Sequence, residues 1–410
     1  MARQSAQRGD GPSVRDGRRG AGRMTDPLLR VPFAAPLLGE EEVTAVTEVL
    51  RSGWIGTGAV ARDTERLLTR YLNVEHALLL NSGTAALHLA LLTLGVGPGH
   101  EVIVPTVTFT ASAATVVHAG ATPVLVDVEP HRLTVDVEQV RRHITARTRA
   151  VMAVHFAGRM ADVRALRALC DEHGLALIED SAHALPAERD GATPGRLADA
   201  AAFSFFVTKP LTSAEGGLLV CHRADLAAEA RVLSAHGIDR DAFARHHGGR
   251  APHYDVVAAG MKYNMPDVTA AILRCQLERS DALRERRRAI AERYAKGLAP
   301  TRLLLPPADT TDDASSWYLY VVQVPRGVDR DHLADRLRAR GIGTSVHFRP
   351  LHQFSYYRDQ LPSAAAAFPV ADGSYPRLLS LPIFPAMSDE DVQAVIDALS
   401  DELRQAVGRS

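Results

Sequence analysis

Short aliphatic runs alternate with helical patterns between about residues 75 and 222, and this alternation constrains the fold more than any other feature of the chain. It is typical of a largely parallel β-sheet covered by helices. The expected strands are Ala77–Leu80, Glu101–Pro105, Thr122–Asp127, Ala150–His155, Leu175–Asp180, Ala200–Phe205 and Gly217–Cys221, and the expected helices are Thr84–Leu94, Ala161–His173 and Asp225–Ala235. The sequence therefore predicts an α/β fold with a mostly parallel, mixed sheet.

The remaining third of the chain has a different pattern. A long Arg-rich amphipathic stretch, Val268–Lys296, leads out of the α/β region. Beyond Pro306 we expect strands at Ser316–Val324 and Gly343–Phe348 and helices at Arg330–Arg340 and Ser388–Ala406. This mixture favours a smaller C-terminal α+β domain. We therefore expect a large domain over residues 27–290 and a small domain over residues 291–410.

The first 26 residues fit neither domain. They carry six arginines, three aspartates and five glycines, without the apolar stretch of a secretion signal. They have a small excess of positive charge but no aromatic residue that could stack on nucleic-acid bases, which argues against a nucleic-acid-binding arm. We expect residues 1–26 to be a disordered leader.

Composition excludes several classes of protein. Lys plus Arg (47) and Asp plus Glu (48) nearly cancel, which argues against binding to nucleic acid or a membrane surface through bulk charge. The three cysteines, Cys170, Cys221 and Cys275, are too far apart for a disulfide framework or a zinc cluster and favour a reducing, cytoplasmic setting. His246, His247 and His253 are close in sequence but lack metal-ligand spacing, so we expect no metal site.

A phosphate-binding pattern follows the first expected strand. The run Asn81-Ser82-Gly83-Thr84-Ala85-Ala86-Leu87 opens an apolar helix. Free amide groups at a helix N-terminus, small residues and a threonine hydroxyl suit a phosphate or another anion. Ser-Gly-Thr is also an ordinary N-cap turn, so this run alone leaves both interpretations open.

An acid ends another expected strand. Asp180 lies in the run Ile178-Glu179-Asp180-Ser181-Ala182-His183, and ligands of open α/β sheets bind at the carboxyl ends of the strands. Taken singly, Asp180 is better explained as a residue that caps a helix or a turn.

A lysine completes the set. Lys209 comes five residues after Ser204, between an apolar strand and Gly216-Gly217. Burial among apolar neighbours should lower the pKa of its amine and make it nucleophilic. An exposed loop lysine is the alternative. Because the basic residues of this chain are overwhelmingly arginine, a retained lysine favours amine chemistry.

These three motifs together have one common use. A phosphate cradle, an acid able to pair with a pyridinium nitrogen and an amine able to form a Schiff base are what pyridoxal 5′-phosphate requires of a protein. The sequence therefore predicts an enzyme that binds this cofactor.

The chain resembles the DegT/DnrJ/EryC/StrS family of sugar aminotransferases, which are pyridoxal phosphate enzymes of fold type I. The resemblance runs from Val31 to about Leu399. It is carried by segments 52–58, 82–86, 154–158, 179–184, 204–209, 248–252, 261–265, 343–349 and 380–385. Within the family, segments 155–158, 248–252, 262–267 and 347–349 look most like UDP-4-amino-4-deoxyarabinose synthase, which aminates the 4-keto carbon of a UDP-sugar.

The resemblance implies a role for each site residue. Lys209 would form the Schiff base and then carry a proton between substrate and cofactor, Asp180 would keep the pyridine nitrogen protonated, and His183 would hydrogen-bond the O3′ side. The other implied cofactor contacts are Gly83, Thr84 and Ser204 at the phosphate, Phe109 on the ring face and Asn264 from the neighbouring subunit. The enzyme would therefore be a homodimer with shared active sites.

The implied reaction transfers an amino group from glutamate to a keto group of a nucleotide-linked sugar, at C4 of a UDP- or dTDP-4-keto sugar. Trp54, His347 and Arg349 are the candidate substrate contacts.

Three alternatives use the same fold: a cyclitol aminotransferase, a keto-sugar dehydratase and a regulatory protein without turnover. Lys209 argues against the dehydratase branch, in which histidine replaces the lysine, and the presence of all three motifs argues against the regulatory protein. Gly56, Ala114 and Pro210 depart from the usual family pattern, which leaves the substrate open.

Overall fold

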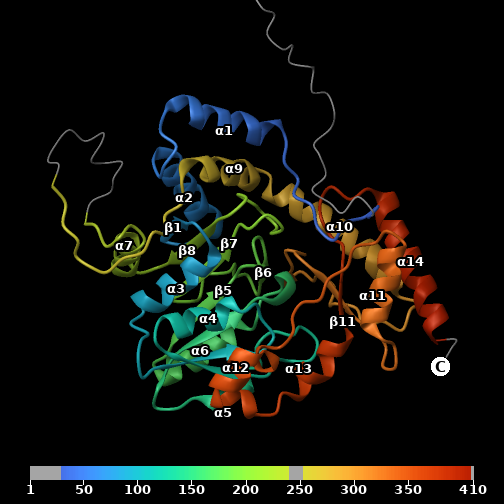
Figure 1. Cartoon of the computed structure of the whole chain (residues 1–410). Helices are drawn as coiled ribbons and strands as arrows, with labels where there is room; N and C mark the ends of the chain where they lie inside the picture. The colour runs from blue at the N-terminus through green and yellow to red at the C-terminus, as the bar shows by residue number, and fades with distance from the viewer. Residues whose placement is uncertain (1–28, 240–252, 408–410) are drawn as a thin grey trace, which may run out of the picture.

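The computed structural model describes residues 29–239 and 253–407 and has a seven-stranded mixed sheet at its centre (Figure 1). The strand order is β1-β8-β7-β5-β4-β2-β3. Strand β8 runs antiparallel to both of its neighbours, and the other pairs are parallel. The strands are β1 (His76–Leu80), β2 (Glu101–Pro105), β3 (Thr122–Val126), β4 (Thr148–Val154), β5 (Ala176–Asp180), β7 (Ala200–Ser204) and β8 (Gly217–Cys221). All seven expected strands of this region are confirmed.

Helices cover both faces of the sheet because its strands are apolar on both sides. Successive residues of a strand point to opposite faces, so Leu78 and Leu80 join one core cluster while Ala77 and Leu79 join another. One face carries α3 (Gly83–Thr93), α4 (Ala111–His118) and α7 (Ala224–Leu233), and the other α2 (Ala59–Leu72), α5 (Val137–His143) and α6 (Val163–His173). This is the expected α/β architecture of fold type I.

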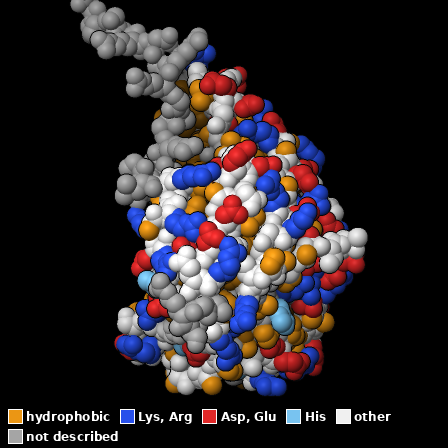
Figure 2. Space-filling view, turned by 90° about the vertical axis from the view of Figure 1, so that its right-hand side faces the viewer, with side chains coloured by type: hydrophobic (Ala, Val, Ile, Leu, Met, Phe, Trp, Pro, Cys, Tyr) orange, Lys and Arg blue, Asp and Glu red, His pale blue; other side chains and the backbone are white. Residues whose placement is uncertain are grey.

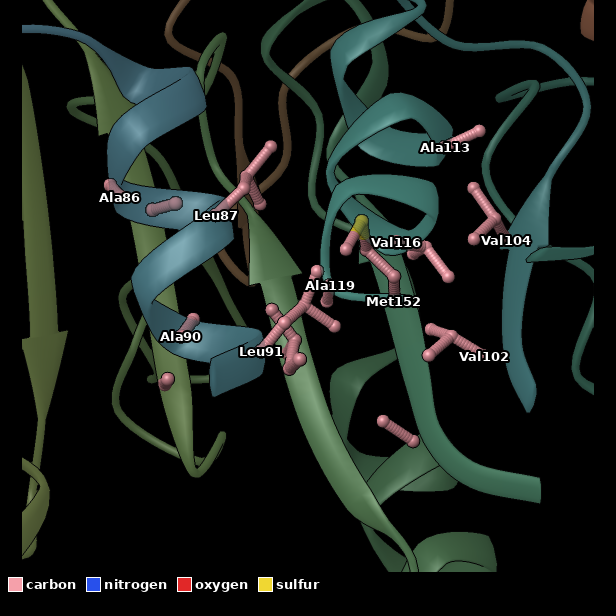
Figure 3. Close-up of a cluster of buried hydrophobic side chains, with 14 of the residues drawn as sticks. Ala86, Leu87, Ala90, Leu91, Val102, Val104, Ala113, Val116, Ala119 and Met152 are labelled. Carbon is pink, nitrogen blue, oxygen red and sulfur yellow. The ribbon is translucent and has the colours of Figure 1, made fainter. Parts of the chain in front are cut away.

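The packing of α3 and α4 fixes the edge of the sheet where the cavity described below lies. Leu87 and Leu91 of α3, Val116 of α4 and Met152 of β4 belong to one buried cluster and point into the space between helices and strands (Figure 3). Truncating one of these leucines to alanine would cost about 2–5 kcal/mol of stability. Helix α3 is apolar on almost every side because it is enclosed by the sheet and by α4 and α7.

The C-terminal part forms a second cluster of elements. Strands β10 (Tyr320–Gln323) and β11 (Leu378–Leu381) pair antiparallel and share a core with α10 (Ser280–Leu298), α11 (Arg330–Ala339) and α14 (Asp389–Val407). These helices lie together at the right of Figure 1. The short helices α12 (Ser355–Gln360) and α13 (Pro369–Ser374) return to the first core instead, through Tyr357 and Ala371.

Helix α10 runs across the expected domain boundary at residue 290. Its Leu283 packs in a core of the large sheet, whereas Ile290 and Tyr294 pack in the C-terminal core. The division into domains stays a prediction, and the leader predicted at residues 1–26 lies outside the described residues.

Two segments singled out in the sequence differ in detail from a single regular element. The amphipathic stretch Val268–Lys296 forms two helices, α9 (Asp267–Glu278) and α10. Arg279 between them has φ −107° and ψ 6°, and its guanidinium pairs with Glu42 of α1 (Glu40–Ser52).

The strand predicted over Gly343–Phe348 pairs with β11 only where Ser345 meets Ser380. The chain then turns so that His347 and Phe348 reach the cavity described below. The remaining short elements are β6 (Glu188–Arg189), β9 (Asp313–Ala314) and 3₁₀ turns at Phe156–Gly158, Leu351–Gln353, Pro362–Ala365 and Tyr375–Arg377.

The surface and the cysteines carry little further information about function. Figure 2 shows Lys/Arg and Asp/Glu side chains interspersed over one face. Cys170, Cys221 and Cys275 are all free thiols. Within the described ranges, no helix combines the length and apolar character needed to cross a bilayer, and no group of three or more His, Cys, Asp or Glu side chains could hold a metal ion. His246 and His247 lie outside those ranges.

Candidate active site

A cavity of about 410 Å³ lies at the edge of the sheet where β1, β4, β5 and β7 end. Its lining brings together eight of the residues singled out in the sequence: Gly83, Thr84, Phe109, Asp180, His183, Ser204, Lys209 and His347. The carboxyl ends of parallel strands meet at one edge of a sheet, which explains why segments far apart in the chain converge here.

The start of α3 closes one end of the cavity. Ser82 is the N-cap, and its hydroxyl accepts a 3.1 Å hydrogen bond from the amide of Ala85. Gly83 packs tightly on β7, since a Cβ there would lie 3.0 Å from Cβ of Ser204. Amide groups at the start of the helix therefore face a small polar space suited to an anion.

The carboxylate of Asp180 is fixed by two donors. Oδ2 accepts a 2.7 Å hydrogen bond from the hydroxyl of Ser112, and Oδ1 accepts one of 3.2 Å from the amide of Ala182. Ser112 is itself 2.7 Å from the hydroxyl of Thr108, which lines the cavity. The acid at the end of β5 therefore has a set orientation.

Two histidines in the cavity are uncharged at neutral pH. Burial, with Lys209 second, lowers the pKa of His183 well below its ordinary value and that of His347 to about 4. Nδ1 of His183 is buried and has no hydrogen-bond partner among the described residues. Nδ1 of His347 is 2.9 Å from the hydroxyl of Ser380 on β11.

Lys209 lies in the loop between β7 and β8, with its amine in the cavity. Nζ is 4.5 Å from the ring centre of Tyr318. Burial lowers the pKa of this amine to about 8, although the Asp180 carboxylate opposes the shift. About a tenth of the amine is therefore neutral and nucleophilic at pH 7, far more than in an ordinary lysine.

These features fit pyridoxal 5′-phosphate. The unpartnered Nδ1 of His183 offers a polar contact to a bound group. Gly83 is the first residue of α3, and the first amides of a helix are available to a phosphate. A nucleophilic amine and a fixed acid lie on the same cavity.

Three predicted contacts lie outside this cavity. The indole N–H of Trp54 donates to the carbonyl of Thr57, whose hydroxyl accepts from the side-chain amide of Asn264. Arg349 donates to the carbonyl of Gln353 and lies over the ring of Phe354. None of the three predicted residues lines the cavity of its own chain.

Other residues of the site were not predicted from the sequence. Ser112 gave no signal beyond lying three residues after Phe109 in a helix of small residues. Tyr318 lies within the segment predicted as a strand, and a strand pattern alone does not indicate that this side chain points toward Lys209. Phe348 and Glu215 also line the cavity.

The fold and the site define a class of protein, the pyridoxal phosphate-dependent aminotransferases. The model of the DegT/DnrJ/EryC1/StrS aminotransferase family matches residues 36–400, and the chain belongs to this family. Its cofactor is pyridoxal 5′-phosphate, as the sequence predicted.

Individual relatives match over nearly their whole length. The spore coat polysaccharide biosynthesis protein SpsC of Bacillus subtilis is 41% identical over 380 residues, which cover 92% of this chain and 98% of SpsC. The putative sugar aminotransferase Spr1654 of Streptococcus pneumoniae, solved in its PMP form, has a TM-score of 0.86 at 32% identity, with 92% and 100% of the two chains covered. The aminotransferase TlmJ of Streptoalloteichus hindustanus has a TM-score of 0.85 at 35% identity, with the same coverage.

Proposed function

We propose that this aminotransferase moves an amino group from glutamate to the keto group of a nucleotide-linked sugar, at C4 of a UDP- or dTDP-4-keto sugar. The convergence of Lys209, Asp180 and the start of α3 on one cavity carries the amino-transfer part of the proposal. SpsC is a spore coat polysaccharide biosynthesis protein and Spr1654 a putative sugar aminotransferase, and both relatives support a sugar as acceptor.

Three residues of the cavity have the main tasks in this reaction. Lys209 would hold the cofactor through its amine and would move the proton to and from the substrate carbon. Asp180 would keep the pyridine nitrogen of the cofactor protonated, and His183 would offer its unpartnered Nδ1 to the bound group. When bound, the cofactor supplies an electron sink for the bond-breaking step.

Binding and orientation fall to the other lining residues. Gly83, Thr84 and Ser204 line the cavity and would hold the phosphate, and Phe109, also in the lining, would stack on the ring. His347 lies near Lys209 from the C-terminal part of the chain and is the best placed of the three proposed substrate contacts.

We further propose that two chains share each site. Phe109 and Phe206, at the cavity, are 57% and 41% exposed in the single chain, and Val43 and Leu50 on α1 are also exposed. No arginine of the described residues lines the cavity, although phosphate and carboxylate groups are well matched by guanidinium. A second copy of the chain would cover the exposed apolar side chains and would bring Asn264 and cationic side chains to the cavity.

The purified, cofactor-loaded protein provides the test. L-Glutamate should remove the visible absorption of the lysine-bound cofactor, and 2-oxoglutarate should restore it. A panel of 3-keto and 4-keto nucleotide sugars, followed by mass spectrometry, should then give an aminated 4-keto product. Amination of a keto-cyclitol but of no sugar would overturn the substrate class, and bleaching by another amino acid alone would overturn the donor. Lys209→Ala is the negative control.

A further inference from the structure

Helix α10 carries three consecutive arginines that have very different surroundings. Arg286 pairs with Asp389, and Arg288 pairs with Glu285 and Glu292 of its own helix. Arg287 is only 4% exposed and forms no ion pair with a carboxylate of the described residues. Burying a guanidinium without a counter-ion is unfavourable, so its position calls for an explanation.

The contacts of Arg287 lie behind the loop that carries Lys209. Nη1 donates a long, 3.4 Å hydrogen bond to the carbonyl of Pro210, and Nε has no partner in the described structure. The guanidinium also acts on Tyr318, since its charge lowers the pKa of that hydroxyl against the dominant effect of burial, which raises it.

Tyr318 connects this buried charge to the cavity. Its hydroxyl is 3.2 Å from the hydroxyl of Thr208, and its ring lies 4.5 Å from Nζ of Lys209 and 4.5 Å, centre to centre, from the ring of His183. Arg287 therefore contacts Pro210, the residue after Lys209, and its charge acts on Tyr318. The hydroxyl of Tyr318 is in turn within hydrogen-bond distance of Thr208, the residue before Lys209.

We propose that Arg287 is a positioning residue that holds the segment Thr208–Lys209–Pro210 from the side opposite the cavity. Pro210 has no N–H, so its carbonyl is the only backbone hydrogen-bonding group it offers, and Arg287 binds that group. The inference rests on the proposed role of Lys209 as the cofactor amine. It explains why a costly buried cation lies next to this loop.

If the segment Thr208–Lys209–Pro210 is loosened, the pKa of the Lys209 amine should change. Burial is the main cause that holds the pKa of Lys209 at about 8, against an ordinary value of 10.5, and the other groups that face the amine are Asp180, His183, His347 and Tyr318. Water entering around a loosened loop would raise this pKa, and removal of the positive guanidinium would act in the same direction.

The pKa of Lys209 can be measured separately because the chain has few lysines. The chain has three, Lys209, Lys262 and Lys296, and the last two are exposed. Competitive acetylation of the full-length, cofactor-free chain across a range of pH, read by peptide mass spectrometry, gives the pKa of each amine. Arg287→Met should raise the pKa of Lys209 by about one unit and leave Lys262 and Lys296 unchanged. It should also lower kcat by about tenfold with little change in KM.

Arg288→Met is the matched control on the same helix and should change neither quantity. Arg287→Lys keeps the charge but lacks the planar set of donors, so its Lys209 pKa should fall between those of wild type and Arg287→Met. A folded Arg287→Met with an unchanged Lys209 pKa would overturn the proposal and leave Arg287 a purely structural role. If that variant does not fold, Arg287→Lys decides, and a wild-type pKa for Lys209 in it would overturn the proposal equally.

The acetylation experiment is independent of the proposed function. Attachment of the cofactor to Lys262 or Lys296 in the wild-type protein would remove the role of Lys209 as cofactor amine, but it would not change what the acetylation reports about Arg287. The two failures are therefore distinguishable.

Discussion

The hydroxyl of Ser112 donates a 2.7 Å hydrogen bond to Oδ2 of Asp180, and both groups are buried. Ser112 lies in the first turn of α4 and Asp180 ends β5, so this bond ties the helix beside the cavity to the acid at its floor. The hydroxyl of Thr108, 2.7 Å from Ser112, extends the network toward the cavity. A carboxylate held in this way has little freedom to turn from a bound ring nitrogen.

Replacing Ser112 by alanine should therefore lower kcat by about tenfold, corresponding to ~1.4 kcal/mol, because a buried acceptor loses its partner. Steady-state kinetics on the cofactor-saturated enzyme measures this. Thr115→Val on the same helix removes a hydroxyl that bonds only backbone carbonyls and should leave kcat unchanged. Equal losses in the two variants would mean that the helix, rather than the bond to Asp180, matters.

Asp180→Asn should lower kcat by at least about a hundredfold while the cofactor stays bound. The amide has nearly the shape of the carboxylate, but it carries no charge to keep a proton on the pyridine nitrogen. Absorption spectroscopy reports cofactor occupancy, and kinetics reports turnover. Undiminished turnover would remove the proposed role of Asp180.

The depressed pKa of Lys209 makes the stability of the cofactor-free protein depend on pH. Between about pH 8, its value when folded, and pH 10.5, its ordinary value, the unfolded chain binds the proton more strongly, so stability should rise with pH. Lys209→Met removes this effect and should be more stable than wild type by about 1–3 kcal/mol below pH 8. Denaturant unfolding at several pH values should show the difference shrinking toward pH 10.5, and a constant difference would show that Lys209 is not buried as a charge.

Much of the fold was predictable because the strands are buried on both faces. Runs such as Glu101–Pro105 and Gly217–Cys221 are mostly apolar and buried at every residue, and their bounds match the structure. Helix α1 was not predicted, since its polar sequence has few apolar positions and two of its apolar side chains, Val43 and Leu50, are exposed. Buried elements have an apolar sequence pattern that makes them predictable, and an element with little burial lacks a clear pattern of this kind.

The residues that converge on the cavity were predictable for a different reason. Asp180, Lys209 and the turn at Gly83 each follow a strand, and the sheet places strand ends together. Ser112 and Tyr318 were not predictable, because each matters through a tertiary contact with a distant segment. Ser112 contacts Asp180, 68 residues away along the chain, and Tyr318 contacts Lys209, 109 residues away. The sequence also did not indicate that Trp54, Asn264 and Arg349 lie outside the cavity of a single chain.

Shared active sites can be tested by mixing two inactive variants. If Asn264 of one chain serves the cavity of the other, Lys209→Ala and Asn264→Ala homodimers should each have low activity. Dissociating and reassociating them together should restore activity, since one site of each hybrid dimer has both residues intact. The mixture should regain up to about a quarter of wild-type activity if subunits pair at random. A mixture no more active than the average of its parents would contradict the sharing of Asn264.

The most direct test of the account is to find where the cofactor is attached. Borohydride reduction of the native enzyme fixes the cofactor to the amine that holds it, and peptide mass spectrometry then identifies that amine among Lys209, Lys262 and Lys296. The structure predicts modification of Lys209 alone, because that amine lies in the cavity with Asp180 and the start of α3. Modification at Lys262 or Lys296, with Lys209 unmodified, would contradict the assignment of this cavity as the active site.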